Sequence, residues 1–215
     1  MPTASNATPL IALDAIVIDT ETTGLDPARA RIVEIGMVPL VGGKLDEKAT
    51  LRRLIHPGQP IPAVTTQIHH IDDAMVASAP NFANAWPEVA AALSDSILIG
   101  HALGFDLAVL KRECESAGLP WASPRTLDTR LLAEVAEPHL GGYTLDHLAS
   151  WLGVTVENRH SAVGDATLTA RIFLALLPKL REGHIRTLAE AEQACLALTG
   201  VLDEQHRAVV IDLGW

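Results

Sequence analysis

Four acidic residues and one histidine are of types that can do metal and acid–base chemistry. Asp19 and Glu21 end a buried apolar run, and side chains two apart on a strand point to the same side. Asp106 and Asp165 stand at the expected starts of helices, and His160 comes five residues before Asp165. Each acid alone has a structural explanation, because exposed acids are common and first-turn acids cap helices. Together, four carboxylates at the openings of elements in one α/β sheet indicate a site for hard divalent cations.

Five segments have the composition of strands. The run 15–20 is continuous, apolar and β-branched, which is typical of a central strand buried on both faces. Residues 31–41 are also strand-like, and Gly42-Gly43 predicts a hairpin turn into a strand over 44–55. The shorter runs 97–100 and 126–129 complete the set. We therefore expect three antiparallel strands first, with the acids of 19–21 where the first strand ends.

Helical spacing of apolar residues predicts the elements that position the other acids. Asn81 can cap a helix over 82–93, and a helix over 107–117 follows Asp106. Further helices are expected over 144–152, 165–177 and 187–199, and Pro178 is expected to end the helix that follows Asp165. The last fifteen residues contain one strand-like run, 208–211, and no evident chemistry.

Composition excludes several classes of protein. The chain has 215 residues, 48% of them hydrophobic and 20% charged, which is typical of a compact, ordered domain. Two distant cysteines are too few for a disulfide framework or a thiolate metal site. The start lacks a signal peptide and no segment has the apolar length of a membrane span, so a cytoplasmic protein without membrane partners is expected. A net charge of −10 has the wrong sign for coating nucleic acid, so any such contact must be local.

Three ordered motifs surround the four acids. They are Ile18-Asp19-Thr20-Glu21-Thr22-Thr23-Gly24-Leu25, His101-Ala102-Leu103-Gly104-Phe105-Asp106 and His160-Ser161-Ala162-Val163-Gly164-Asp165-Ala166. In this order they resemble the DEDDh family of 3′-to-5′ exonucleases, typified by the proofreading ε subunit of bacterial DNA polymerase III and similar to RNase T. The likeness runs from about residue 13 to 178, and an ordered set is far more specific than any single short motif. It implies a ribonuclease H-like α/β fold, with a five-stranded mixed sheet and helices on both faces.

The resemblance implies a role for each member of the acidic set. Asp19, Glu21, Asp106 and Asp165 correspond to the family's metal-binding carboxylates, and His160 corresponds to its general base. Oxygen ligands suit two Mg²⁺ or Mn²⁺ ions, which neutralise the phosphate, activate a water and stabilise the leaving 3′ oxygen. A neutral histidine can take the proton of that water at physiological pH.

The resemblance also implies contacts to the substrate. Thr20, Leu25, His69 and Phe105 occupy positions at which the family faces its substrate, with His69 in the element Ile68-His69-His70-Ile71. As alternatives, Leu25 and Phe105 are core residues and the two histidines lie in a solvated loop. Ala102 departs from the family, which usually has asparagine there, so a hydrogen bond near the second motif is missing.

Residues outside the motifs receive ordinary structural interpretations. Arg125, Arg130 and Arg159 could steer phosphates near the cleft, although ion-paired or solvated arginines are the favoured interpretation. His101 is interpreted as structural. The four tryptophans are not spaced as a stacking platform and are expected to serve packing.

The hypothesis from sequence is therefore a metal-dependent 3′–5′ exonuclease. It would release nucleoside 5′-monophosphates from single-stranded or frayed DNA 3′ ends. The alternatives are an exoribonuclease or oligoribonuclease acting on RNA 3′ ends, a catalytically inactive nucleic-acid-binding module, and a small-molecule metal phosphatase. We expect an N-terminal tail over 1–12, the exonuclease domain over 13–180 and a helical extension of that domain over 181–215.

Overall fold

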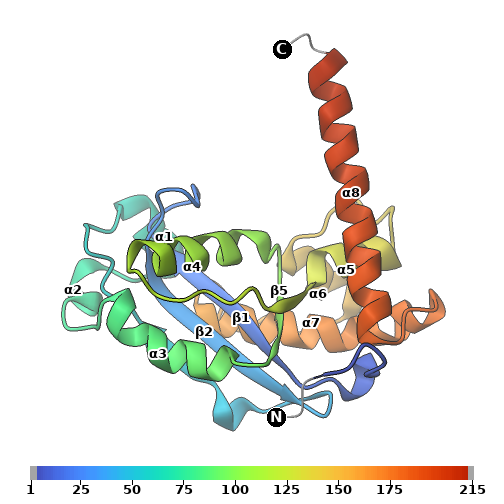
Figure 1. Cartoon of the computed structure of the whole chain (residues 1–215), viewed down its shortest axis with the longest axis horizontal. Helices are drawn as coiled ribbons and strands as arrows, with labels where there is room; N and C mark the ends of the chain where they lie inside the picture. Colours follow the sequence, from blue (N-terminus) through green and yellow to red (C-terminus); the bar gives the residue numbers. More distant parts are fainter. Residues whose placement is uncertain (1–3, 213–215) are drawn as a thin grey trace.

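The computed structural model describes residues 4–212, and the side chains of residues 4–200 (Figure 1). Its strands are β1 (Ala15–Thr22), β2 (Ile32–Val41), β3 (Lys44–Leu45), β4 (Leu51–Leu54), β5 (Ile97–Gly100) and β6 (Arg125–Asp128). Its helices are α1 (Ala63–His69), α2 (Asp73–Val76), α3 (Phe82–Leu93), α4 (Gly104–Ser116), α5 (Thr129–Ala136), α6 (Leu145–Leu152), α7 (Ala162–Glu182) and α8 (Leu188–Asp212). Two short 3₁₀ turns, η1 (Leu10–Ala12) and η2 (Glu47–Ala49), complete the elements.

The strands form one open mixed sheet in the order β3-β2-β1-β5-β6, with β4 also paired to β2. β2 is antiparallel to β1, β3 and β4, whereas β5 is parallel to both β1 and β6. The predicted α/β, ribonuclease H-like fold is confirmed, and the described residues contain six strands instead of five. The expected strand over 44–55 is divided because Asp46 accepts a hydrogen bond from the Lys48 amide and caps η2 between β3 and β4.

Helices cover both faces of the sheet, as predicted (Figure 1). Alternate residues of β1 point to opposite faces, so Val17 packs in the cluster that includes α5, α6, α7 and the start of α8. Ile16 and Ile18 pack in the second cluster, against α3 and α4. Because β1 is buried on both faces, the acids at its C-terminal end are held by a rigid central strand.

Two expectations about the C-terminal third are wrong. Pro178 does not end the helix that follows Asp165, because α7 continues to Glu182. Proline removes one helical hydrogen bond, but the buried Leu176 and Leu180 on either side hold the helix against the core. The strand-like run 208–211 belongs to α8. No strand of the sheet pairs with this run, and hydrogen bonds within the helix satisfy its backbone instead.

Three helices were not predicted: α1, α2 and α5. The described N-terminal residues are also tied to the fold, since Leu10 is buried and the Leu10 amide donates to the Arg186 carbonyl.

The second half of α8 extends away from the rest of the molecule (Figure 1). Within residues 4–212, no helix combines the length and apolar character needed to cross a membrane.

Candidate active site

Three of the predicted carboxylates meet at the C-terminal end of β1. Ligand oxygens of Asp19, Glu21 and Asp165 all lie within 4.8 Å of one another. Asp19 and Glu21 share one side of β1, and Asp165 stands in the first turn of α7. Side chains from two elements, about 145 residues apart in sequence, therefore form one compact acidic cluster.

Asp106, the fourth predicted carboxylate, is held beside this cluster by a hydrogen bond from Thr20. The Thr20 hydroxyl donates to Asp106 Oδ1 at 2.6 Å, so the residue between the two β1 acids fixes the fourth carboxylate. Asp106 stands in the first turn of α4. The start of α4 is held by Asp128, whose carboxylate accepts from the amides of Ala102 and Leu103 at 3.0 and 2.9 Å.

The N-terminus of α7 is fixed to the sheet by a buried acid. Glu34 on β2 is fully buried, and its Oε2 accepts from the Ala162 amide at 2.8 Å, while Arg52 pairs with the other oxygen. Two residues along β2, on the same face of the sheet, Gly36 lies directly under the helix, where a Cβ atom would approach the Ala162 carbonyl carbon to 2.2 Å. This close contact sets the height of Asp165 above the sheet.

Burial and mutual repulsion favour the protonated forms of Asp19, Glu21 and Asp106 when no cation is bound. Burial, reinforced by Asp106, raises the pKa of Asp19 well above its usual range. Burial also raises the pKa of Glu21 to about 7 and that of Asp106 to about 6, although the Thr20 hydroxyl lowers the latter. Negative charge is therefore stabilised poorly here unless a cation enters.

The donor set fits a hard cation. All the clustered ligands are carboxylate oxygens, and Asp165 Oδ1 is buried without a hydrogen-bond partner among the described residues. An unpaired buried carboxylate oxygen is costly, whereas coordination to a cation would satisfy it. Oxygen donors of this kind suit Mg²⁺ or Mn²⁺.

A cleft of about 270 Å³ opens beside Asp19 and Asp106. Its lining brings together all four predicted substrate contacts, Thr20, Leu25, His69 and Phe105. Leu25 is 89% exposed, so the core alternative for it is wrong, and Phe105 is half-buried. The cleft also contains His101, which sequence reasoning treated as structural.

The two histidines of the cleft are held by hydrogen bonds. His69 is buried at the end of α1, so it does not lie in a solvated loop, and its Nδ1 accepts from the Ile71 amide at 3.1 Å. Its proton therefore resides on Nε2, which has no hydrogen-bond partner among the described residues. His101 Nδ1 lies 3.0 Å from the Thr129 hydroxyl. Burial lowers the pKa of both, which favours neutral imidazoles.

His160 is exposed and stands apart from the cleft lining. Its backbone is in the left-handed region, with φ of 61°, in a loop in which Asn158 is also left-handed. The carboxylate cluster within 4.8 Å does not include this side chain. Thus the structure gathers the acids and leaves the predicted base exposed to solvent, outside both the acidic cluster and the cleft lining.

The loop that carries Leu25 is anchored to α4. Arg31 donates to both oxygens of Glu113, at 2.6 and 3.1 Å, and Glu113 is only 3% exposed. Two hydrogen bonds close this loop. The Thr23 amide donates to the Arg31 carbonyl, and the Arg31 amide donates to the Thr23 hydroxyl. Leu25 is therefore an exposed apolar side chain on a fixed support.

The three arginines considered in the sequence are all ion-paired. Arg125 pairs with Glu192 and Arg130 with Glu134. Arg159 pairs with Asp165 and Asp146, so it alone of the three contacts the acidic cluster.

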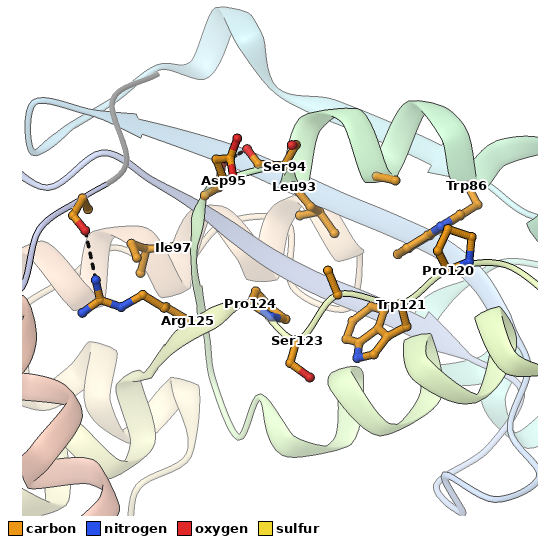
Figure 2. A pocket seen from close by; sticks show the side chains of 14 residues that line it. Trp86, Leu93, Ser94, Asp95, Ile97, Pro120, Trp121, Ser123, Pro124 and Arg125 are labelled. Carbon is orange, nitrogen blue, oxygen red and sulfur yellow. Dashed lines mark hydrogen bonds between the residues drawn. The ribbon is translucent and has the colours of Figure 1, made fainter.

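A second hollow lies at the opposite end of β5 (Figure 2). It is mainly apolar, and Trp86 and Trp121 line it together with Ile97 and Arg125. Trp86 is buried and stacks on Phe82 at 5.3 Å, and its ring lies 5.9 Å from that of Trp121. These two tryptophans pack against each other at a distance from the carboxylates.

A sequence model of the exonuclease family, RNase T, matches residues 16–173. The chain belongs to this exonuclease family. Over 183 residues it is 40% identical to a DNA polymerase III subunit epsilon-like protein of Rhodobacter capsulatus, covering 84% of this chain and 26% of that protein. It is 31% identical to the DNA polymerase III subunit epsilon of Aquifex aeolicus, covering 77% of this chain and 81% of that one.

Solved structures of this exonuclease fold superpose on the chain. Exonuclease X in complex with 5′-overhanging duplex DNA matches with a TM-score of 0.67 and 25% identity, covering 84% of this chain and 99% of that one. Exonuclease I of E. coli in complex with a dT13 oligonucleotide matches with a TM-score of 0.69 but 16% identity, which supports the fold alone. The exonuclease chain spans 26%, 12% and 19% of the length of three longer relatives.

Proposed function

We propose that this exonuclease is metal-dependent and removes nucleoside 5′-monophosphates from the 3′ ends of single-stranded or frayed DNA. The observation that carries the proposal is the acidic cluster of Asp19, Glu21 and Asp165, with an unpaired buried oxygen on Asp165 and with Asp106 fixed beside it. A cleft with an exposed apolar side chain opens next to these acids.

In this proposal the four carboxylates hold two Mg²⁺ or Mn²⁺ ions, with Asp19 at the centre of the set. When bound, the ions supply charge neutralisation of the phosphate and stabilise the leaving 3′ oxygen. Asp106 stays aligned through the Thr20 hydroxyl, and Asp165 through the contact of α7 with Glu34. Burial of these acids excludes bulk water, which strengthens each electrostatic contact.

His160 is proposed to accept the proton of the attacking water. Its exposure at the site edge allows it to pass this proton on to solvent. The left-handed backbone at His160 is a costly conformation for a residue other than glycine, and such strain is frequent in functional loops. We therefore expect the loop 157–161 to bring the imidazole toward the acids when substrate binds.

Leu25, Phe105 and His69 are proposed to hold the terminal nucleotides. The exposed Leu25 and the half-buried Phe105 offer apolar contact to bases, and such stacking tolerates any base. His69 lines the same cleft at the end of α1, so its imidazole lies where a terminal nucleotide would bind. The resemblance of the chain to a DNA polymerase III epsilon-like protein favours DNA over RNA.

The test is digestion of 5′-labelled oligonucleotides of one sequence, as single-stranded DNA, blunt duplex DNA and RNA. Reactions contain Mg²⁺, Mn²⁺ or a chelator. A descending ladder on single-stranded DNA that disappears in chelator supports the proposal, whereas a ladder confined to RNA would establish the exoribonuclease alternative. Hydrolysis of a chromogenic phosphomonoester without any ladder would favour a phosphatase.

A variant pair separates catalysis from fold. Asp19→Asn removes one charge from the acidic cluster, and we expect activity to fall by at least about 10³-fold, in the range found when electrostatic stabilisation of a transition state is lost. Asp95→Asn is the matched control, because Asp95 is exposed in a turn beside the second hollow. Equal activity of both variants and the unmodified protein would show that the acidic cluster does not carry the cleavage, and absence of cleavage by all three would revive the alternative of a binding module without catalysis.

A further inference from the structure

Arg159 bridges a carboxylate inside the acidic cluster and one outside it. Its Nη1 pairs with Asp165 Oδ2, and its Nε and Nη2 donate to the two oxygens of Asp146 at 2.9 and 3.3 Å. The Asp165 side chain is 11% exposed, whereas that of Asp146 is 61% exposed. The guanidinium thus stands between the interior of the site and solvent, held on the outer side by a bidentate contact.

The two oxygens of Asp165 have different partners. Oδ2 is paired with Arg159, while Oδ1 is buried without a hydrogen-bond partner among the described residues and belongs to the Asp165 carboxylate of the acidic cluster. No other arginine or lysine within residues 4–200 forms an ion pair with Asp19, Glu21, Asp106 or Asp165. Among the side chains that the structure describes, Arg159 is therefore the one cation that is ion-paired with these acids.

We propose that Arg159 is the counter-ion of the metal-free site and that it opposes cation binding. This inference rests on the metal site of the proposed function and adds a residue that sets its affinity. The negative charge of the acidic cluster attracts the guanidinium, whereas two divalent cations would neutralise that charge and repel the guanidinium. Arg159 therefore stabilises the metal-free site more than the loaded one.

Thermodynamic linkage makes the effect reciprocal. If Arg159 lowers the affinity for cations, then bound cations weaken the pair between Arg159 and Asp165 by the same factor. The bidentate contact to Asp146 retains the guanidinium at the rim when Asp165 turns to the cations. Asp146 thus provides a second position for the guanidinium, outside the acidic cluster, where Arg159 does not compete with the cations for Asp165.

The experiment measures Mn²⁺ binding to the full chain by isothermal titration calorimetry, with thermal unfolding in chelator and in Mn²⁺. Arg159→Gln removes the charge and should bind Mn²⁺ about tenfold more tightly, within the usual range of coupling between sites. Its metal-free form should unfold at a lower temperature, so the rise in melting temperature caused by Mn²⁺ should be larger than in the unmodified protein.

Two further variants make the result specific. Arg171→Gln is the matched control, because the ion-pair partners of Arg171 within residues 4–200 are the exposed Glu47 and Glu157, and its Mn²⁺ affinity should be unchanged. Arg159→Lys keeps the charge but loses the bidentate contact to Asp146, and it should bind Mn²⁺ less tightly than the Gln variant, since the coupling is electrostatic.

The outcomes separate this inference from the proposed function. Unchanged or weaker Mn²⁺ binding by Arg159→Gln overturns the counter-ion role, and so does a Lys variant that behaves like the Gln variant. If Arg159→Gln does not fold, Arg159→Met, which removes the charge and keeps a long side chain, takes its place, and Mn²⁺ binding no tighter than that of the unmodified protein then overturns the role. Absence of Mn²⁺ binding by the unmodified protein overturns the metal site itself.

Discussion

Gly36→Ala should displace the start of α7 and weaken both fold and metal site. The new Cβ would lie 2.2 and 2.4 Å from the carbonyl carbon and oxygen of Ala162 and 2.4 Å from the Val163 amide nitrogen. These are backbone atoms, so no side-chain rotation relieves the overlap. Overpacking of a core by one methyl group costs about 1–3 kcal/mol, and the fixed neighbours place this case at the upper end.

The displacement also weakens the buried hydrogen bond between the Ala162 amide and Glu34, because both groups lie at the same contact. Loss of a hydrogen bond to a charged group costs about 1.5–3 kcal/mol if it is complete. We expect a decrease of at least about 3 kcal/mol in the free energy of unfolding. For a domain of this size that corresponds to roughly 6–12 °C in melting temperature.

The assay is urea and thermal unfolding in chelator, followed by Mn²⁺ titration of the folded variant. Mn²⁺ affinity should fall as well, because Asp165 lies in the first turn of the displaced helix. Gly104→Ala is the matched control, since its Cβ would meet no atom within 4 Å and its stability should be equal or slightly higher. A Gly36→Ala protein within about 2 °C of the unmodified protein would refute the argument that this contact sets the position of α7.

Three further predictions concern the acids and the cleft. Because burial raises the pKa of Glu21 to about 7 and that of Asp106 to about 6, the metal-free native state holds protons that the unfolded chain releases near pH 4. Its free energy of unfolding should therefore fall between pH 5 and pH 8, and saturating Mn²⁺ should reduce this slope; a rise with pH in chelator would contradict the assignment. Leu25→Ala should change stability by less than about 0.5 kcal/mol, because the side chain is exposed, yet raise KM for single-stranded DNA several-fold; an unchanged KM would remove Leu25 from the substrate site. Glu34→Gln should lower stability by about 1.5–3 kcal/mol in urea unfolding, whereas Glu47→Gln, at an exposed position, should have little effect, and equal stabilities would argue against the anchoring of α7.

Much of the fold and the acidic set could be predicted because both leave local patterns. The apolar run 15–20 identifies the central strand, and helical spacing locates α4 and α7, so the elements that carry the four acids followed from the sequence. The interruption of the strand over 44–55 by η2 depended on a single cap at Asp46, which is a weak signal.

The contacts that orient the site could not be predicted, because they join residues far apart in sequence. Glu34 and Ala162 are separated by 128 positions, and nothing in the local pattern around Glu34 distinguishes it from a solvated acid. The entry of His101 into the cleft likewise depends on how elements pack. Only the packed structure brings these partners together.

The anchored Leu25 has a consequence for which sequences the enzyme can digest. Leucine offers no hydrogen bond by which one base could be told from another, and the Arg31–Glu113 pair beneath the loop keeps it from adapting to individual bases. Under the proposed function, all four nucleotides should therefore leave the strand at similar rates. Such a nuclease would recognise the shape of a free strand end and would have no preference for the base sequence that it degrades.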